Sequence, residues 1–164
     1  MSKVYCYGDN VDTDRIIPGK YTKTLDKAEL VAHVFEDLDP EFKHTVKPGD
    51  IVVAGENFGC GSSREQAAIA IKEAGVQLVV AKSFARIFFR NAINIGLPVV
   101  EIANHKLDES SEIHYDLEKG YLGDTSQDIA YEVPALPKFL RSILAAGGLV
   151  PYLKSGQTLE LEGE

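Results

Sequence analysis

The residues best suited to chemistry lie in one short loop, 55–64, which reads Gly-Glu-Asn-Phe-Gly-Cys-Gly-Ser-Ser-Arg. An apolar run, 50–54, precedes this loop, and a run of small and apolar residues, 66–74, follows it. Backbone N–H groups of a glycine-rich turn between a strand and a helix can converge on an anion. Arg64 adds a forked cation that suits a carboxylate or a phosphate. The loop therefore predicts an anion-binding site.

Ser62 and Ser63 allow two interpretations. Ser62 with Glu65, and Ser63 with Gln66, fit the capping-box pattern, in which a serine hydroxyl caps the helix and stabilises it by about 1 kcal/mol. A serine at a helix N-terminus can also accept a proton if N–H groups and a nearby cation stabilise its alkoxide. Arg64 would supply that charge or hold a substrate carboxylate. The residue types alone leave both interpretations open.

Other reactive side chains give weaker signals. The loop lacks the Lys-Ser/Thr pair of a phosphate-binding loop, and Arg64 stands where a Gly-x-Gly-x-x-Gly motif needs its third glycine. Cys60 is either a thiolate of lowered pKa or a small space-filling residue. Asp12 and Asp14 flank Thr13, where carboxylates cap backbone N–H groups or orient a catalytic histidine. No His/Cys pair has metal-ligand spacing, so we expect no metal site made by this chain alone.

Composition limits the class of protein. The chain has 164 residues, of which 45% are hydrophobic and 26% charged, values typical of one globular domain. A net charge of −8 without a basic stripe argues against nucleic acid as a partner. No apolar run approaches the roughly 20 residues that span a bilayer, and the N-terminus does not resemble a secretion signal. With only two cysteines, the sequence predicts a cytoplasmic protein without membrane contact.

The periodicity of apolar residues indicates how the loop is positioned. Strands alternate with helices along the chain, an order typical of an α/β fold with a mixed, partly parallel sheet. A segment of alternating residues, 113–133, indicates a β-hairpin. The expected strands are 4–7, 51–54, 78–81 and 98–102, and the expected helices are 26–38, 66–74, 85–95 and 137–146.

Five segments form a recognisable set of motifs: 8–14 (GDNVDTD), 57–65 (NFGCGSSRE), 82–92 (KSFARIFFRNA), 94–98 (NIGLP) and 147–152 (GGLVPY). They resemble those of a known family, the small subunits of 3-isopropylmalate dehydratase, which are swivel-domain proteins of the aconitase superfamily. The resemblance covers essentially the whole chain. It implies a single swivelling β/β/α domain over residues 1–154, followed by a polar acidic tail, 155–164.

The resemblance also implies an activity. Such enzymes are hydro-lyases that isomerise 2-isopropylmalate and 3-isopropylmalate by dehydration and rehydration, a step of leucine biosynthesis. Their 4Fe–4S cluster is held by three cysteines, a set that this chain with two cysteines cannot supply. The implied partner is therefore a cluster-bearing large subunit, in a heterodimer or heterotetramer that binds a small hydroxy-dicarboxylate.

Roles transfer only to residues that match the family's motifs. By position, Ser62 resembles the catalytic base that removes the proton next to a carboxylate. Ser63 and Arg64 resemble the groups that bind a substrate carboxylate. Asp14 resembles an active-site carboxylate that supports a histidine of the large subunit.

One segment differs from the family's pattern. The loop that selects the substrate often reads Tyr-Leu-Arg-Thr in isopropylmalate enzymes, whereas residues 21–24 here read Tyr-Thr-Lys-Thr. Thr22 in place of leucine makes the expected substrate pocket less apolar. Lys23 in place of arginine replaces a forked guanidinium by a point charge. Homoaconitate, citramalate and a dimethylmalate-type acid therefore stand as alternative substrates. A non-catalytic anion-binding module is the alternative from another class.

Overall fold

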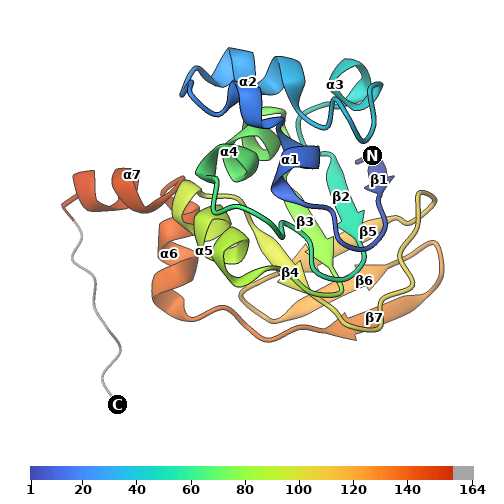
Figure 1. The fold of residues 1–164 in the computed structure, drawn as a ribbon. Helices are drawn as coiled ribbons and strands as arrows, with labels where there is room; N and C mark the ends of the chain where they lie inside the picture. Colours follow the sequence, from blue (N-terminus) through green and yellow to red (C-terminus); the bar gives the residue numbers. More distant parts are fainter. Residues whose placement is uncertain (157–164) are drawn as a thin grey trace.

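Four parallel strands form the central sheet of the computed structural model, which describes residues 1–156. They are β1 (Val4–Cys6), β2 (Ile51–Ala54), β3 (Leu78–Ala81) and β4 (Val99–Glu101), and they lie side by side in chain order. Because parallel crossovers are right-handed, strands added in one direction place their connecting helices on one face of the sheet. Figure 1 shows these helices together above the sheet. They are α1 (Thr13–Ile16), the 3-10 helix η1 (Gly19–Tyr21), α2 (Lys27–His33), α3 (Phe42–Thr45), α4 (Glu65–Glu73) and α5 (Arg86–Ile95).

A second, antiparallel sheet covers the other face of the central sheet (Figure 1). It consists of β5 (Ile113–Asp116), β6 (Tyr121–Asp124) and β7 (Ile129–Glu132). Two further helices, α6 (Lys138–Ala145) and α7 (Leu149–Lys154), pack beside α5. The layers therefore follow the order β/β/α.

Burial on both faces explains why the parallel strands are continuously apolar. On β2, Val52 and Ala54 belong to the core under the helices, whereas Ile51 and Val53 belong to the core shared with Leu122 of β6. Successive side chains of a strand point to opposite faces, so a strand covered on both sides needs apolar residues at every position. All four residues of β2 are buried.

The predicted α/β class is confirmed, but the parallel and antiparallel strands form two sheets instead of one mixed sheet. Segment 113–133 is a three-stranded meander, not a single hairpin. Its second turn has no glycine to mark it. Asp128 takes the left-handed conformation there with φ 55°, and the Asp124 carboxylate accepts the N–H groups of Glu112 and Ser126.

The helix predicted over 26–38 ends early, because α2 stops at His33. Two residues later, Phe35 takes φ 53° and is fully buried between the rings of Tyr7 and Phe42. Its N–H donates to the Ile16 carbonyl at 2.8 Å. Core packing therefore overrides the apolar spacing that suggested a longer helix.

Three short α-helices, α1, α3 and α7, and the 3-10 helix η1 were not predicted. Of the expected acidic tail 155–164, only Ser155 and Gly156 are among the described residues, and the rest lies outside them. Within residues 1–156, no helix combines the length and apolar character that crossing a membrane requires.

Candidate active site

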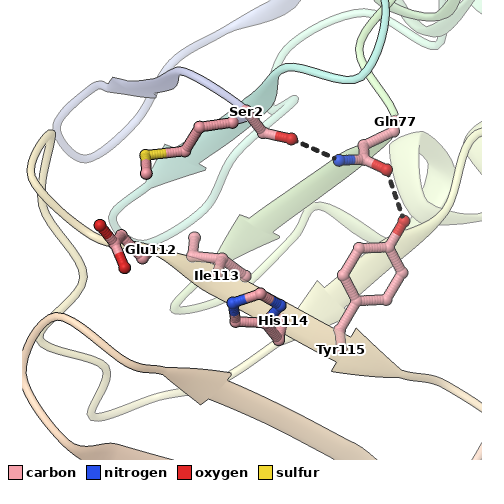
Figure 2. A pocket seen from close by; sticks show the side chains of 7 residues that line it. Ser2, Gln77, Glu112, Ile113, His114 and Tyr115 are labelled. Carbon is pink, nitrogen blue, oxygen red and sulfur yellow. Dashed lines mark hydrogen bonds between the residues drawn. The ribbon is translucent and has the colours of Figure 1, made fainter.

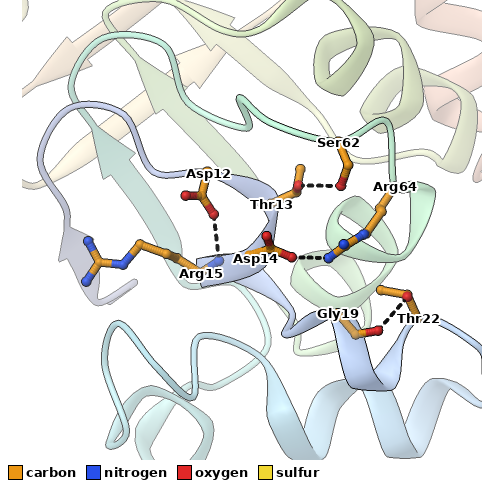
Figure 3. A network of polar contacts seen from close by, with 8 residues as sticks. All are labelled: Asp12, Thr13, Asp14, Arg15, Gly19, Thr22, Ser62 and Arg64. Carbon is orange, nitrogen blue, oxygen red and sulfur yellow. Dashed lines mark hydrogen bonds and ion pairs between the residues drawn. The ribbon is translucent and has the colours of Figure 1, made fainter.

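The loops that follow β1, β2 and β3 meet at the carboxyl edge of the parallel sheet, the edge at which open α/β sheets bind ligands. Residues 55–64 occupy the middle of this edge, because β2 lies between β1 and β3. Figure 3 shows side chains from the loop after β1 and from the glycine loop pointing toward one another.

Backbone hydrogen bonds fix the first half of the glycine loop on both sides. The Gly59 N–H donates to the Val11 carbonyl at 2.7 Å, and the Phe58 N–H donates to the Ser83 carbonyl at 3.0 Å. These bonds extend the pairing of the parallel strands beyond their ends. The loop is therefore a fixed platform and not a free connection.

Aromatic packing explains why Gly59 must be a glycine. Its φ is 80°, and a Cβ at this position would lie 2.2 Å from the Phe88 ring. Phe88 contacts the fully buried Phe58 with ring centroids 5.2 Å apart, and Phe84 contacts Phe58 at 6.0 Å. The chain therefore passes directly over an aromatic cluster before it reaches the serines.

Ser62 does not cap helix α4. The helix begins at Glu65 with Arg64 as its N-cap residue, and no side chain makes a capping bond there. The capping-box prediction for Ser62 and Ser63 is therefore wrong, because the helix starts too far along the chain for either hydroxyl. The Ser62 hydroxyl instead lies 3.1 Å from Oγ1 of Thr13 (Figure 3).

Arg64 turns its guanidinium toward α1. Its Nη1 forms an ion pair with Asp14, whose side chain is 64% exposed while that of Arg64 is 26% exposed. The same guanidinium packs against Gly19, where a Cβ would lie 3.2 Å from Nη2. Asp14, predicted to support a histidine of another subunit, thus holds the predicted carboxylate-binding arginine within this chain.

The second half of the glycine loop keeps its hydrogen-bonding capacity unused. Within residues 1–156, the N–H groups of Gly61, Ser62 and Ser63 donate to no other group, and the exposed Ser63 hydroxyl has no partner. These three donors directly precede Arg64 in the chain. The arrangement can bind an anionic group such as a carboxylate.

The predicted specificity loop begins beside Arg64. Thr22 follows η1, and its hydroxyl donates to the Gly19 carbonyl at 2.7 Å. The Gln66 side chain donates to the Thr22 carbonyl at 2.9 Å, which ties this loop to α4. Lys23 is exposed to solvent, and no ion pair joins it to another described residue.

Comparison of the chain with known proteins identifies its family. A family model described as "Aconitase C-terminal domain" matches residues 5–105. The chain belongs to the aconitase C-terminal domain family. The resemblance drawn from the sequence motifs is thereby confirmed.

Individual relatives match nearly the whole aconitase-domain chain. The 3-isopropylmalate dehydratase small subunit of Aquifex aeolicus is 56% identical over 155 residues, covering 93% of this chain and 92% of the relative. The 2,3-dimethylmalate dehydratase small subunit of Eubacterium barkeri is 49% identical over 154 residues, with coverage of 93% and 94%. A solved structure, 3-isopropylmalate dehydratase of Methanocaldococcus jannaschii, matches with a TM-score of 0.87 and 48% identity, covering 94% of this chain and 93% of that one.

The cysteines of this aconitase-domain chain do not fit an iron–sulfur cluster or a nucleophile. Burial, and then the nearby Asp12 carboxylate, raise the pKa of the Cys60 thiol, the opposite of what a reactive thiolate needs. Burial also raises the pKa of Cys6 to about 11. Among residues 1–156, no group of three His, Cys, Asp or Glu side chains is arranged to hold a metal. Two cysteines fall short of the thiolate set that a 4Fe–4S cluster needs.

A separate cavity of about 720 Å³ opens at the amino edge of the sheet, where Ser2 precedes β1 and Gln77 precedes β3 (Figure 2). Three of its polar side chains, those of Ser2, Gln77 and Tyr115, are hydrogen-bonded within the protein. The Gln77 amide donates to the Ser2 hydroxyl at 3.0 Å and to the Gly49 carbonyl at 2.5 Å, and it accepts from the Tyr115 hydroxyl at 3.2 Å. The sequence pattern did not indicate this cavity.

Proposed function

We propose that this chain is the small subunit of a 3-isopropylmalate dehydratase, a hydro-lyase that interconverts 2-isopropylmalate and 3-isopropylmalate in leucine biosynthesis. The observation that carries the proposal is the state of Ser62. Its hydroxyl caps no helix and contacts Thr13, in a loop that has three unused backbone donors and ends at Arg64. Relatives of about 50% identity that carry this name support the substrate class.

Ser62 acts as the base in the dehydration. Its Oγ accepts the proton from the carbon next to a substrate carboxylate, the C–H electron pair becomes the double bond, and hydroxide leaves the neighbouring carbon. A serine hydroxyl is a weak base at neutral pH unless its anion is stabilised. The positive N-terminal end of α4, the N–H groups of residues 61–63 and the Arg64 charge would provide that stabilisation.

Arg64 binds a substrate carboxylate and keeps it in line with Ser62. Asp14 engages Nη1 and so orients the fork, which leaves Nη2 for the substrate. The exposed Ser63 hydroxyl adds a further donor to the same carboxylate. Asp14 also keeps an oxygen for a histidine of the partner, as the resemblance implies.

A large subunit completes the site. Because this chain lacks the ligand set for a 4Fe–4S cluster, we assign the cluster, which supplies a Lewis acid for the leaving hydroxide, to that partner. The two form a heterodimer or heterotetramer. We place the complex in the cytoplasm, where free thiols such as Cys6 and Cys60 persist.

The loop 21–24 reads the variable group of the substrate. Thr22 uses its hydroxyl on the Gly19 carbonyl, so no unpaired hydroxyl faces the bound acid. An isopropyl group can therefore be accommodated, and we favour isopropylmalate. The Eubacterium barkeri relative supports 2,3-dimethylmalate as the second candidate, ahead of citramalate and homoaconitate.

Reconstitution tests the proposal. The chain is co-purified with a candidate large subunit, the cluster is rebuilt, and 2-isopropylmalate is followed by the ultraviolet absorbance of the unsaturated intermediate. We expect turnover by the complex and none by either chain alone. A complex that converts no hydroxy-dicarboxylate refutes the proposal. Tight dicarboxylate binding to the isolated chain by calorimetry would favour the anion-binding module instead.

A further inference from the structure

We propose that Thr13 is a positioning residue for Ser62, which donates a hydrogen bond to the serine oxygen and stabilises its anionic form. The inference rests on the proposed function, in which Ser62 is the base. It assigns a role to a residue that the sequence presented only as the spacer between Asp12 and Asp14.

Thr13 is a buried polar side chain at an otherwise exposed site. It is 2% exposed, while Ser62 beside it is exposed. Its Oγ1 lies 3.1 Å from Oγ of Ser62. Within residues 1–156, that serine is the single hydrogen-bond partner of the Thr13 hydroxyl, so its proton has no competing acceptor.

The direction of the hydrogen bond follows from counting protons. Each neutral hydroxyl carries one proton, so either residue can donate while both are protonated. Once Ser62 has lost its proton, only Thr13 has one to give. The bond then becomes a donation to an anion, which is shorter and stronger than one between neutral groups. Thr13 thus favours the form of Ser62 that removes the substrate proton.

The backbone holds Thr13 in place for this contact. Its N–H donates to the Cys60 carbonyl at 2.8 Å, a bond that joins the two loops next to the serine. Asp12 caps helix α1 through the Arg15 N–H at 3.0 Å, so the first residue of that helix is fixed. A Cβ on Gly61 would lie 3.4 Å from the Thr13 hydroxyl, which shows how closely the glycine loop approaches it.

The test compares Thr13→Val with Thr13→Ser in the reconstituted complex. Valine keeps the buried volume and removes the hydroxyl, whereas serine keeps the hydroxyl and removes a methyl group. We expect Thr13→Val to lower kcat by about 10- to 100-fold, the loss of one hydrogen bond to a charged oxygen, with KM changed less than about threefold. Thr13→Ser should retain kcat within about threefold, because the donor remains.

A double variant separates positioning from general damage. In a Ser62→Ala background, Thr13→Val should cause no further loss of kcat, since the oxygen that it serves is gone. Thermal unfolding and association with the large subunit identify any misfolded variant, and Thr13→Ala replaces Thr13→Val if valine is not tolerated. An unchanged kcat in an active complex, or an equal loss in both backgrounds, overturns the role of Thr13. An inactive wild-type complex instead refutes the proposed function.

Discussion

The two edges of the parallel sheet differ in whether their polar groups have hydrogen-bond partners. At the amino edge, the Gln77 side chain forms hydrogen bonds with Ser2, Gly49 and Tyr115. At the carboxyl edge, the backbone N–H groups of residues 61–63 remain unused within the described chain. Both edges are hollow or exposed, so concavity alone does not identify a site. We infer the site at the carboxyl edge from the unused backbone donors that precede Arg64.

The same contrast divides the glycine loop. Residues 55–59 give their N–H groups to the neighbouring loops and to the side chains of Asp9 and Ser83. This fixed first half holds residues 61–63, whose N–H groups are unused, next to α1, where Thr13 contacts Ser62. Rigid support with open donors is what an anion-binding catalytic loop requires.

At the carboxyl edge, we expect Arg64→Lys to have the largest effect after a substitution of Ser62. Lysine keeps the charge but loses the fork held by Asp14, so we expect KM for 2-isopropylmalate to rise about 10- to 100-fold with a smaller change in kcat. Steady-state kinetics of the complex measures it. Arg90→Lys on the exposed surface of α5 is the matched control and should change neither constant. An unchanged KM for Arg64→Lys would show that this arginine does not bind the substrate.

The specificity loop gives a test of intermediate size. Thr22→Leu combined with Lys23→Arg should shift the ratio of kcat/KM for isopropylmalate over citramalate by about 10-fold toward isopropylmalate. The reason is that the larger leucine side chain would add an apolar contact with the substrate worth about 1–3 kcal/mol. Lys27→Arg, on α2 and paired with Glu73, serves as the control for charge-conserving change. Identical ratios in both variants would mean that this loop does not read the substrate.

At the amino edge we expect a loss of stability without a kinetic effect. Gln77→Leu leaves three half-buried partners unsatisfied and should lower the free energy of unfolding by about 1–2 kcal/mol. Urea unfolding of the chain measures it, with His114→Ala on the exposed rim of the same cavity as the neutral control. A large fall in kcat for Gln77→Leu would contradict the assignment of catalysis to the carboxyl edge alone.

The contacts of Tyr21, at the start of the specificity loop, should make a small pH-dependent contribution to stability. The hydrogen bond from His33 lowers the pKa of the Glu36 carboxyl, and Tyr21 stacks on His33 with ring centroids 3.7 Å apart. A lowered pKa stabilises the fold above the usual carboxyl pKa, and this is lost as the pH falls through the lowered value. Glu36→Gln should therefore lower Tm by about 1 °C at pH 7 and by less at an acidic pH below the usual carboxyl pKa. A constant difference in Tm at both pH values would contradict this.

The sequence predicted the fold class and the family better than it predicted local structure. Continuous apolar runs predicted the parallel strands, because burial on both faces demands them, and the loop 55–64 indicated an anion site. Capping could not be excluded for Ser62, since only the position where α4 begins decides it. Phe35 and Asp128 escaped prediction for a related reason: both take left-handed conformations that core packing or a turn imposes on ordinary residues. The contact between Thr13 and Ser62 joins positions 49 residues apart, which no local pattern reveals.

Ser62→Ala tests the central claim most directly when binding and chemistry are measured separately in the reconstituted complex. Equilibrium binding of 2-isopropylmalate gives its Kd, and a single-turnover experiment gives the rate constant of dehydration. Loss of a general base predicts a fall of about 10²- to 10⁴-fold in that rate constant, with Kd changed only slightly because Arg64 remains. The free energy of unfolding should fall by no more than about 1–3 kcal/mol, because Ser62 caps no helix and the change removes one hydrogen bond, that to the buried Thr13 hydroxyl. A dehydration rate near that of the wild type would contradict the account.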